Sequence, residues 1–447
     1  MGRAAGAPGV LAILVALGLS ACGSDHRRAR PPDRIRAPTS SPAPVDLPGA
    51  SPHRLLVGIT EQDPAFVWAS QARSRHAAPA AEPGRRQLDV VHPAVYRLFI
   101  DWAQIQPTPD TPPNWDGGRD GCLRGPPCLP WSGIREQLDA VRSRQQQGGL
   151  TVLVVLTDPP PWAAAAPLPG CRLSGARAGS NGVATAALPA YAALARGLLA
   201  VAAQETVSIG YLSAFNEPNV SRILTPQRSR CDPRSPSLAP ARYASLVRAL
   251  APVLAATPGA PRLVLGETAA YGGPGPLRTG AGEFIGDLPR DVVCASDIWS
   301  QHLYISPAAV GARGAQASEL HARGAWDAAG SVGFLTQLHS ALVARGCLRP
   351  PRIWVTETGD GGPIAGNPRP ADPATEQLDC QQMAGALIGW DALGYVDVAV
   401  QYSFREDAAY PVGLVDAGLT RAHATLALWQ AWGQRRAGAP APGPGVC

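Results

Sequence analysis

The run RIWVTETG (352–359) is largely apolar and ends at a carboxylate, Glu357. Seven other short runs are also largely apolar: RLLVGIT (54–60), AVYRLFIDW (94–102), TVLVVLT (151–157), GYLSAFNE (210–217), RLVLGETA (262–269), DIWSQHLY (297–304) and DVAVQYSF (397–404). Several of them are almost continuously apolar, as expected for parallel strands that are covered by helices. The sequence therefore predicts eight parallel strands.

Longer stretches rich in Ala and Leu separate these runs, at 133–147, 187–204, 240–255, 333–345 and 378–393. Their alternation with the strands indicates βαβ units, and residues 187–204 carry an apolar face with the helical period. Eight such units predict a closed (β/α)8 barrel, a TIM barrel, over residues 51–435. A doubly wound sheet is the alternative, but it usually has fewer strands and a Gly-rich phosphate loop, which TEQD (60–63) does not resemble.

Chemically reactive side chains gather at the ends of the predicted strands. They are Arg97, Asp101, Trp102, Asp158, Asn216, Glu217, Glu267, His302, Tyr304, Glu357, Tyr402 and Arg405. The carboxyl ends of the strands in such a barrel share one face, and active sites lie there. A core would not tolerate this many ionisable groups without partners. We therefore expect an active site at this face.

The N-terminus indicates export. Arg3 precedes a short apolar run at 10–19, and LSAC (19–22) resembles a bacterial lipobox, which implies cleavage before Cys22 and lipidation of its sulfur. Ordinary secretion with cleavage nearby is the alternative. We expect a signal peptide at 1–21, a polar tether rich in Pro, Arg and Ser at 22–50, and a Pro/Gly-rich tail at 436–447. The protein would then lie on the outer face of the bacterial cell membrane or be secreted.

Charge and cysteine content add two expectations. The net charge is +5 and every basic residue is Arg, but no dense Arg run suggests a nucleic-acid partner. Besides Cys22 there are eight cysteines, an even number that favours disulfides in an exported chain, and no spacing suggests zinc. We expect Cys122 to pair with Cys128, and Cys294 to meet Cys347, because both of the latter precede predicted strands.

Tryptophans are common in the loops after the second and third predicted strands. Trp102 and Trp162 are the main candidates, with Trp115 and Trp131 in the same loops. A flat indole ring can stack on the C–H face of a sugar, an extension of general aromatic behaviour. The alternative is that these rings cap the apolar rim of the barrel. Taken together, the set favours a carbohydrate site.

Glu217 in AFNEPN and Glu357 in WVTETG end the fourth and seventh predicted strands. Two carboxyl groups about 5–5.5 Å apart are what a retaining glycosidase requires. These two motifs, in this strand order, resemble glycoside hydrolase clan A, with families 5 and 39 the most similar, over most of residues 54–432. The resemblance implies a retaining (β/α)8 glycosidase that needs neither metal nor cofactor.

The resemblance also implies roles for single residues. Glu217 would be the acid/base with a raised pKa, and Glu357 the ionised nucleophile. Asn216 would bind the sugar 2-hydroxyl, and Arg97 would hold the nucleophile charged. Tyr304 would donate a hydrogen bond to the nucleophile, and His302 would lie on the same face.

The chain departs from the clan at the eighth predicted strand, which commonly ends in Trp. Here Tyr402 and Arg405 are found instead, and Arg405 would either meet an acidic sugar or pair with Glu406 or Asp407. Glu267 is a rival carboxylate, or else an acceptor behind the site. Asp101 and Asp158 are better explained as loop-capping or subsite residues than as catalysts.

We therefore expect a monomeric enzyme that acts on a poly- or oligosaccharide. Two other functions remain open: a catalytically inactive carbohydrate-binding lipoprotein on the same barrel, and a solute-binding lipoprotein that serves a transporter. The presence of both glutamates argues against the first. The eight strands argue against the second, because solute-binding proteins have two lobes with doubly wound sheets.

Overall fold

The computed structural model describes residues 53–61, 82–116, 133–259, 261–322, 324–360, 372–406 and 411–447. These residues belong to one compact unit, Pro42–Cys447. The predicted signal peptide, the lipid attachment at Cys22, the tether and the Cys122–Cys128 pair all lie outside the described residues, as does Trp131.

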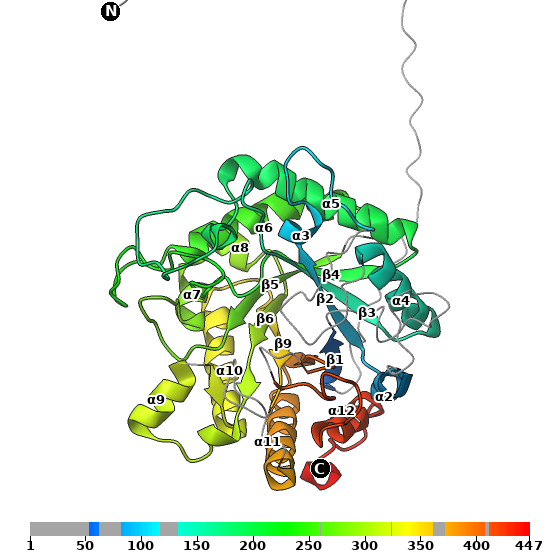
Figure 1. Cartoon of the computed structure of the whole chain (residues 1–447). Coiled ribbons are helices and arrows are strands. Elements are labelled where there is room, and N and C mark those ends of the chain that lie inside the picture. The colour runs from blue at the N-terminus through cyan, green and yellow to red at the C-terminus, as the bar shows by residue number, and fades with distance from the viewer. Residues whose placement is uncertain are drawn as a thin grey trace, which may run out of the picture. The chain divides into compact units, whose positions relative to one another are not determined.

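Eight parallel strands close into a barrel, as predicted (Figure 1). They are β1 (Leu56–Thr60), β2 (Val95–Asp101), β3 (Thr151–Thr157), β4 (Ile209–Ser213), β5 (Arg262–Ala269), β6 (Ile298–His302), β9 (Arg352–Thr358) and β10 (Val396–Tyr402). Their order around the barrel is β1-β10-β9-β6-β5-β4-β3-β2, so that each strand pairs with its sequence neighbours in the barrel and β10 returns to β1. Every predicted strand is therefore confirmed, with changes only at the ends.

Two of these changes affect the site. The fourth strand ends at Ser213, so that Asn216 and Glu217 lie in the turn that follows it. The sixth ends at His302, and Tyr304 begins a separate two-stranded sheet, β7 (Tyr304–Ile305) with β8 (Ala325–Trp326). Both changes leave these side chains at the carboxyl end of the barrel, where the loops meet.

Helices surround the barrel on its outside (Figure 1). They are α2 (Glu82–Val91), α3 (Trp102–Ile105), α4 (Ile134–Gln147), α5 (Leu188–Gln204), α6 (Ala239–Ala256), α7 (Ala281–Asp287), α8 (Arg290–Val293), α9 (Gly314–Ala322), α10 (Ala328–Ala344), α11 (Pro373–Ala392) and α12 (Thr425–Gly433). The five predicted helices are confirmed. The fourth of them starts five residues early because the Asp327 side chain accepts a hydrogen bond from Gly330 N and caps α10.

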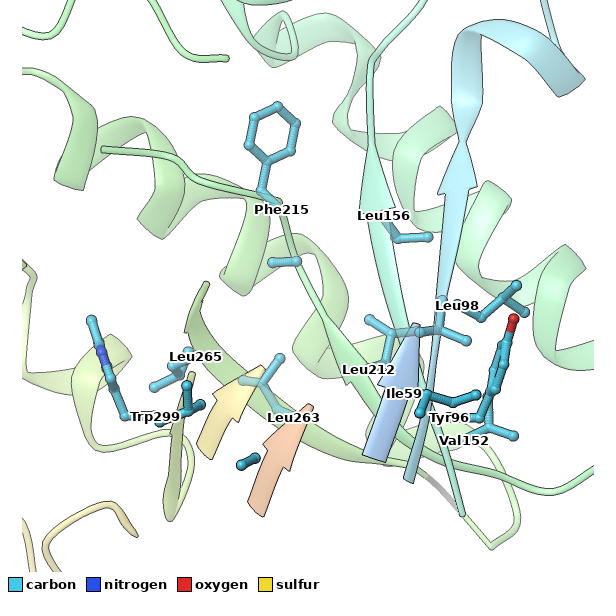
Figure 2. Packing of buried hydrophobic residues seen from close by; sticks show 14 of the residues in the cluster. Ile59, Tyr96, Leu98, Val152, Leu156, Leu212, Phe215, Leu263, Leu265 and Trp299 are labelled. Carbon is cyan, nitrogen blue, oxygen red and sulfur yellow. The ribbon is translucent and has the colours of Figure 1, made fainter. Parts of the chain in front are cut away.

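Alternating side chains of the strands form two separate apolar layers. Residues that point outward pack against the helices, and Figure 2 shows several of them, including Leu98, Val152 and Leu212. Residues that point inward fill the barrel itself, such as Leu153 and Trp354. This alternation is the period-two pattern of a strand, and it leaves the carboxyl end of the interior for polar groups.

Two shifts in strand pairing break the alternation and place carboxylates at the carboxyl end of the barrel. The pairing of β5 with β6 shifts between Gly266 and Thr268, and the pairing of β6 with β9 shifts next to Glu357. A bulge of this kind re-aims a side chain. Glu267, the extra residue on β5, and Glu357 on β9 consequently both reach the same buried arginine, Arg97.

Three disulfides join the described residues: Cys171–Cys231, Cys294–Cys347 and Cys380–Cys447. The Cys294–Cys347 pair is as predicted and joins the segments that lead into β6 and β9. Cys447 links the predicted C-terminal tail to α11. Disulfides persist in oxidising environments, so the chain is one that folds outside the cytoplasm.

One segment in the described part of the chain, Thr185–Gln204, is long and apolar enough to cross a membrane by length and composition. Half of its apolar window is buried inside the structure, where α5 packs against α6 and α4. A core helix of a barrel meets the same criterion, and the buried face of α5 fits that explanation.

Candidate active site

Glu217 and Glu357 meet at the carboxyl end of the barrel. Oxygen atoms of their carboxyl groups and a ring nitrogen of His302 all lie within 4.8 Å of one another. Each glutamate is 5% exposed, so both open into a site that is nearly closed to water. Such a separation leaves room for one scissile bond between the carboxylates and is close to the spacing of retaining glycosidases.

The turns that carry this region contain unusual backbone conformations. Asp158 and Glu217 follow β3 and β4, Glu267 lies in the bulge near the end of the adjacent β5, and their φ angles are 46°, 39° and 52°. Non-glycine residues with positive φ are uncommon, and they cluster at functional sites where surrounding structure holds them. Here a backbone hydrogen bond from Glu217 N to Glu267 O, 2.9 Å long, ties the turn after β4 to the bulge in β5.

Glu357 is held from two sides by buried groups. Arg97 Nη1 donates a hydrogen bond to Oε1 over 2.7 Å, and the Tyr304 hydroxyl donates to Oε2 over 2.9 Å. The Arg97 side chain is fully buried. A cation and a hydrogen-bond donor in a water-poor site stabilise a carboxylate and fix its orientation.

Arg97 also binds the other side of the site. Its Nη2 lies 2.6 Å from Glu267 Oε2 and 2.9 Å from Asn216 Oδ1. Because the amide oxygen of Asn216 accepts this bond, its NH2 group is directed elsewhere and is available as a donor. The one guanidinium thus orients three side chains from three turns or strands.

Glu267 lies behind the pair rather than between its members. It has no exposed surface, and its Oε2 also accepts from the Thr356 hydroxyl at 3.2 Å. Burial would raise its pKa, but Arg97 and His302 outweigh burial and lower the pKa to about 2. The sequence left Glu267 as either a rival catalyst or an acceptor behind the site, and this geometry is that of an acceptor.

His302 connects the carboxylates. Its Nδ1 lies 3.2 Å from Glu217 Oε1 and 3.3 Å from Glu357 Oε2, and its Nε2 lies 2.8 Å from Glu267 Oε2. Burial alone would lower the pKa of His302, but the Glu357 charge and the bonds to Glu217 and Glu267 raise it to about 9. The ring is therefore a cation at neutral pH and donates from both nitrogens.

Arg222 is a site residue that the sequence did not reveal. It lies in the turn after β4, and its Nη2 donates to Glu217 Oε2 over 2.6 Å. Burial would raise the pKa of Glu217, but the charge of Arg222 and the bond to His302 outweigh burial and lower it. The predicted raised pKa of Glu217 is therefore wrong for the chain without substrate, because a cation contacts each of its oxygens.

The predicted contributors from the eighth barrel strand lie deeper than expected. Tyr402 is buried, with its ring edge-on to Phe99 at 6.3 Å between centroids. Arg405 pairs with Glu61, whose Oε1 lies 2.9 Å from Arg405 Nη2 and whose Oε2 accepts from the Arg405 backbone N–H. Glu61, which follows β1, was not singled out in the sequence, and it is a partner of Arg405. The expected partner Asp407 lies outside the described residues.

The two tryptophan candidates differ in position. Trp102 is 1% exposed, and its indole packs edge-on against Trp162 with 5.3 Å between centroids. Trp162 is only partly buried, and its Nε1 donates to Gln106 O. Of the two rings, Trp162 is the one with a surface that a ligand can reach.

Asp101 and Asp158 follow neighbouring strands and serve local structure. Asp101 caps α3 by accepting from Gln104 N, and Asp158 pairs with Arg177 over 2.7 Å. Burial, followed by the Asp158 charge, raises the pKa of Asp101 to about 6. The capping interpretation made from the sequence fits these contacts.

The spacing of Glu217, His302 and Glu357 would also suit a metal ion. A histidine ligand must be unprotonated, whereas His302 donates to carboxylates on both sides. Arg97, Tyr304 and Arg222 donate to the carboxylate oxygens that such an ion would need. The donor set is therefore arranged for a pair of hydrogen-bonded carboxylates rather than for a cation.

No protein-family model and no curated protein matches the sequence. Solved structures do resemble it. A conserved exported protein from Bacteroides fragilis has a TM-score of 0.53 at 13% identity, over 87% of this chain and 80% of its own. The catalytic domain of the family 30 xylanase C from Talaromyces cellulolyticus has a TM-score of 0.49 at 14% identity, over 86% and 76% of the two chains. A family 39 glycoside hydrolase from Bacteroides cellulosilyticus WH2 gives 0.47 at 14%, over 85% and 64%.

At these identities the likeness concerns the fold. The predicted barrel is confirmed by its own eight strands, and the solved structures that it resembles include glycoside hydrolases of families 30, 39 and 5. What this chain does must be argued from the carboxylates and their partners.

Proposed function

We propose that this chain is a retaining glycoside hydrolase that cleaves O-glycosidic bonds of a poly- or oligosaccharide by double displacement. The observation that carries the proposal is the pair Glu217 and Glu357, with carboxylate oxygens within 4.8 Å of each other at the carboxyl end of the barrel. A retaining mechanism needs two carboxyl groups at about this spacing.

In the first step a Glu357 oxygen attacks the anomeric carbon. The bond from that carbon to the glycosidic oxygen breaks, and Glu217 gives its proton to the departing oxygen. Arg97 and Tyr304 hold the Glu357 carboxylate and fix its orientation, at 2.7 and 2.9 Å. The NH2 group of Asn216 donates a hydrogen bond to the 2-hydroxyl of the sugar, an interaction that strengthens in the transition state.

In the second step Glu217, now a carboxylate, removes a proton from water while the water oxygen attacks the same carbon. The ester bond to Glu357 breaks, and the sugar leaves with its original configuration. Both steps use the same two side chains, and Glu217 alternates between acid and base.

The other sequence-based proposals fit around this centre. Trp162 offers an accessible ring for a sugar face, whereas Trp102, Tyr402 and Arg405 would act from buried positions by supporting the walls of the site. The three disulfides fit a chain that is exported, and lipid attachment at Cys22 would hold the enzyme on the outer face of the membrane.

The test is hydrolysis of a panel of 4-nitrophenyl glycosides, from mono- to tetrasaccharides, by the exported chain. We expect at least one glycoside to be turned over, and turnover to be lost in Glu357→Gln. The anomer released, followed by NMR, should be the anomer of the substrate.

An inactive carbohydrate-binding barrel would bind glycans in a microarray and leave every glycoside intact. A product of inverted configuration would also contradict the proposal. Circular dichroism and thermal unfolding of Glu357→Gln check that loss of turnover does not reflect loss of the fold.

A further inference from the structure

Arg222 contacts the oxygen of Glu217 that can carry a proton. His302 contacts the other oxygen, Oε1. Because the ring donates to Oε1, that oxygen remains an acceptor when Glu217 is protonated. The proton is then carried by Oε2, which Arg222 Nη2 holds at 2.6 Å.

Arg222 is also the exposed member of this pair. Its side chain is 44% exposed, whereas that of Glu217 is 6% exposed. Any leaving-group sugar that reaches Oε2 therefore meets the guanidinium of Arg222. A protonated Oε2 accepts a hydrogen bond less strongly than a carboxylate oxygen does, so the bond from Arg222 opposes protonation and favours a change of partner before the acid acts.

The backbone of Arg222 is fixed, so the partner change is a movement of its side chain. Ser180 Oγ donates to Arg222 O at 2.7 Å, and the neighbouring Ser221 N donates to Leu277 O at 3.0 Å. The disulfide Cys171–Cys231 also joins the loops after β3 and β4. The guanidinium is thus carried on a rigid base and has a long, partly exposed side chain with which to reach a ligand.

The three loops around it are rich in positive charge. Between them, residues 158–187, 214–238 and 270–280 contain seven arginines and three acidic residues. The arginines are Arg172, Arg177, Arg222, Arg228, Arg230, Arg234 and Arg278. Besides Arg222, Arg177 pairs with Asp158, Arg228 with Glu283 and Arg234 with Asp232. The surplus of arginine over acidic residues still favours an anionic ligand over a cationic one.

On the premise of the proposed glycosidase function, we propose that Arg222 is a specificity-determining residue that selects substrates whose leaving-group sugar carries an anion. A carboxylate, sulfate or phosphate on that sugar would take the guanidinium away from Glu217. Arginine binds such groups through paired, charge-assisted hydrogen bonds.

The exchange of partners would also prepare the acid. Once Arg222 is bound to the substrate anion, its charge is neutralised and Oε2 is released. Glu217 then keeps His302 as a partner but loses the charge of Arg222, so that burial raises its pKa against a weaker opposition. The correct leaving group would thus both bind and bring Glu217 to the protonation state that attack requires, while a neutral leaving group would leave Arg222 in place.

The experiment compares two aryl glycosides of the sugar that the 4-nitrophenyl panel identifies. One has a 3-carboxyphenyl leaving group and the other a 3-carbamoylphenyl group of similar shape without charge. Both are poor leaving groups that need an acid. We expect kcat/KM of the wild-type chain to favour the carboxylate by at least about tenfold, the scale of one hydrogen bond to a charged group.

In Arg222→Gln the two glycosides should react within about twofold of each other, whereas Arg222→Lys should keep part of the preference because it keeps the charge. The matched control is Arg234→Gln, which removes a 90% exposed arginine of the same loop and should leave the preference unchanged. With the neutral glycoside, the alkaline limb of the kcat/KM profile should move to higher pH in Arg222→Gln, because loss of the cation raises the pKa of Glu217. A merely structural role for Arg222 would not move this limb.

Equal reactivity of the two glycosides with the wild-type chain would overturn the proposal, as would a preference that survives in Arg222→Gln. Both results presuppose that the 4-nitrophenyl glycoside is hydrolysed with dependence on Glu357. Failure of that hydrolysis would instead overturn the glycosidase function itself.

Discussion

The two catalytic candidates lie side by side, but their surroundings differ in one respect. Glu357 is held by Arg97, whose side chain is fully buried, and by the buried Tyr304. Glu217 is held by Arg222, whose side chain is 44% exposed. The cation specific to Glu357 is thus buried, whereas the cation specific to Glu217 is one that a ligand can reach.

This difference matches the two chemical roles. A nucleophile has to be ionised whenever substrate arrives, and a buried cation such as Arg97 favours the carboxylate. An acid/base has to gain and lose a proton in each cycle, which an exchangeable cation such as Arg222 permits, whereas His302 contacts both carboxylates and does not distinguish them. Assigning the roles in the reverse order would place the exchangeable cation beside the nucleophile.

The largest effects should come from removing each carboxylate in turn. We expect Glu357→Gly to lose at least about 10⁴-fold in kcat on every aryl glycoside, the scale found when a covalent catalyst is removed. Azide should restore turnover and give a glycosyl azide of inverted configuration, because it attacks the face that Glu357 leaves open.

Removing Glu217 should instead have an effect that depends on the leaving group. In Glu217→Gln the first step should fall by about 10²–10⁴-fold for phenyl glycosides and much less for 2,4-dinitrophenyl glycosides, which depart without a proton. Pre-steady-state rates of phenol release would show this. An equal loss on both leaving groups would mean that Glu217 is not the acid. The contrast between the surroundings of Glu217 and Glu357 would then not reflect two catalytic roles.

The buried cation Arg97 should also contribute to the free energy of unfolding. Arg97→Gln would leave Glu267 and Glu357 buried without their cation, and we expect unfolding in urea at pH 7 to cost about 3–5 kcal/mol less. The pKa of Glu267 is about 2 in the folded chain, against 4.5 unperturbed. Its stabilisation is present above pH 4.5 and is lost as pH falls towards 2.

In Arg97→Gln the loss of stability between pH 4.5 and pH 2 should be smaller, because the pKa of Glu267 then lies nearer to 4.5. Arg222→Gln, on the exposed side, should change stability much less. A loss in Arg222→Gln as large as that in Arg97→Gln would remove the distinction between a fixed and an exchangeable cation.

The sequence predicted the barrel and the placing of both glutamates for a simple reason. An apolar run that ends in Asn-Glu or Thr-Glu shows where a strand stops, and in a parallel barrel all such ends share one face. The position of Glu217 and Glu357 at this face could therefore be predicted without knowing the paths of the loops. The confirmed Cys294–Cys347 pair follows from the same register, since both residues precede strands.

Arg222 and Glu61 could not be found in this way. Arg222 lies five positions after Glu217 in an irregular turn, and only the folded path of that turn brings its side chain back to Oε2. Glu61 pairs with Arg405, although the two residues lie far apart in the sequence. The bulges at Glu267 and Glu357 were also hidden, because strict alternation would turn these side chains away from the interior. The missed pKa direction at Glu217 follows from the missed arginine.

His302 provides the smallest and most direct test, because it touches both carboxylates. Its pKa is about 9 in the folded chain and 6.5 unperturbed, so its stabilisation is fully present below pH 6.5 and is lost as pH rises through 9. We expect the wild-type free energy of unfolding to fall by about 3 kcal/mol across this window, on the scale of 1.36 kcal/mol per pKa unit. His302→Gln keeps one N–H donor but has no charge to lose, so its stability should be nearly level between pH 7 and 9. Urea unfolding at four pH values measures both slopes. If the wild-type slope is also level, His302 is neutral, and Glu217 then depends on Arg222 alone for the charge that lowers its pKa. In that case displacement of Arg222 by a substrate anion would have a larger effect on the acid than it has with His302 charged.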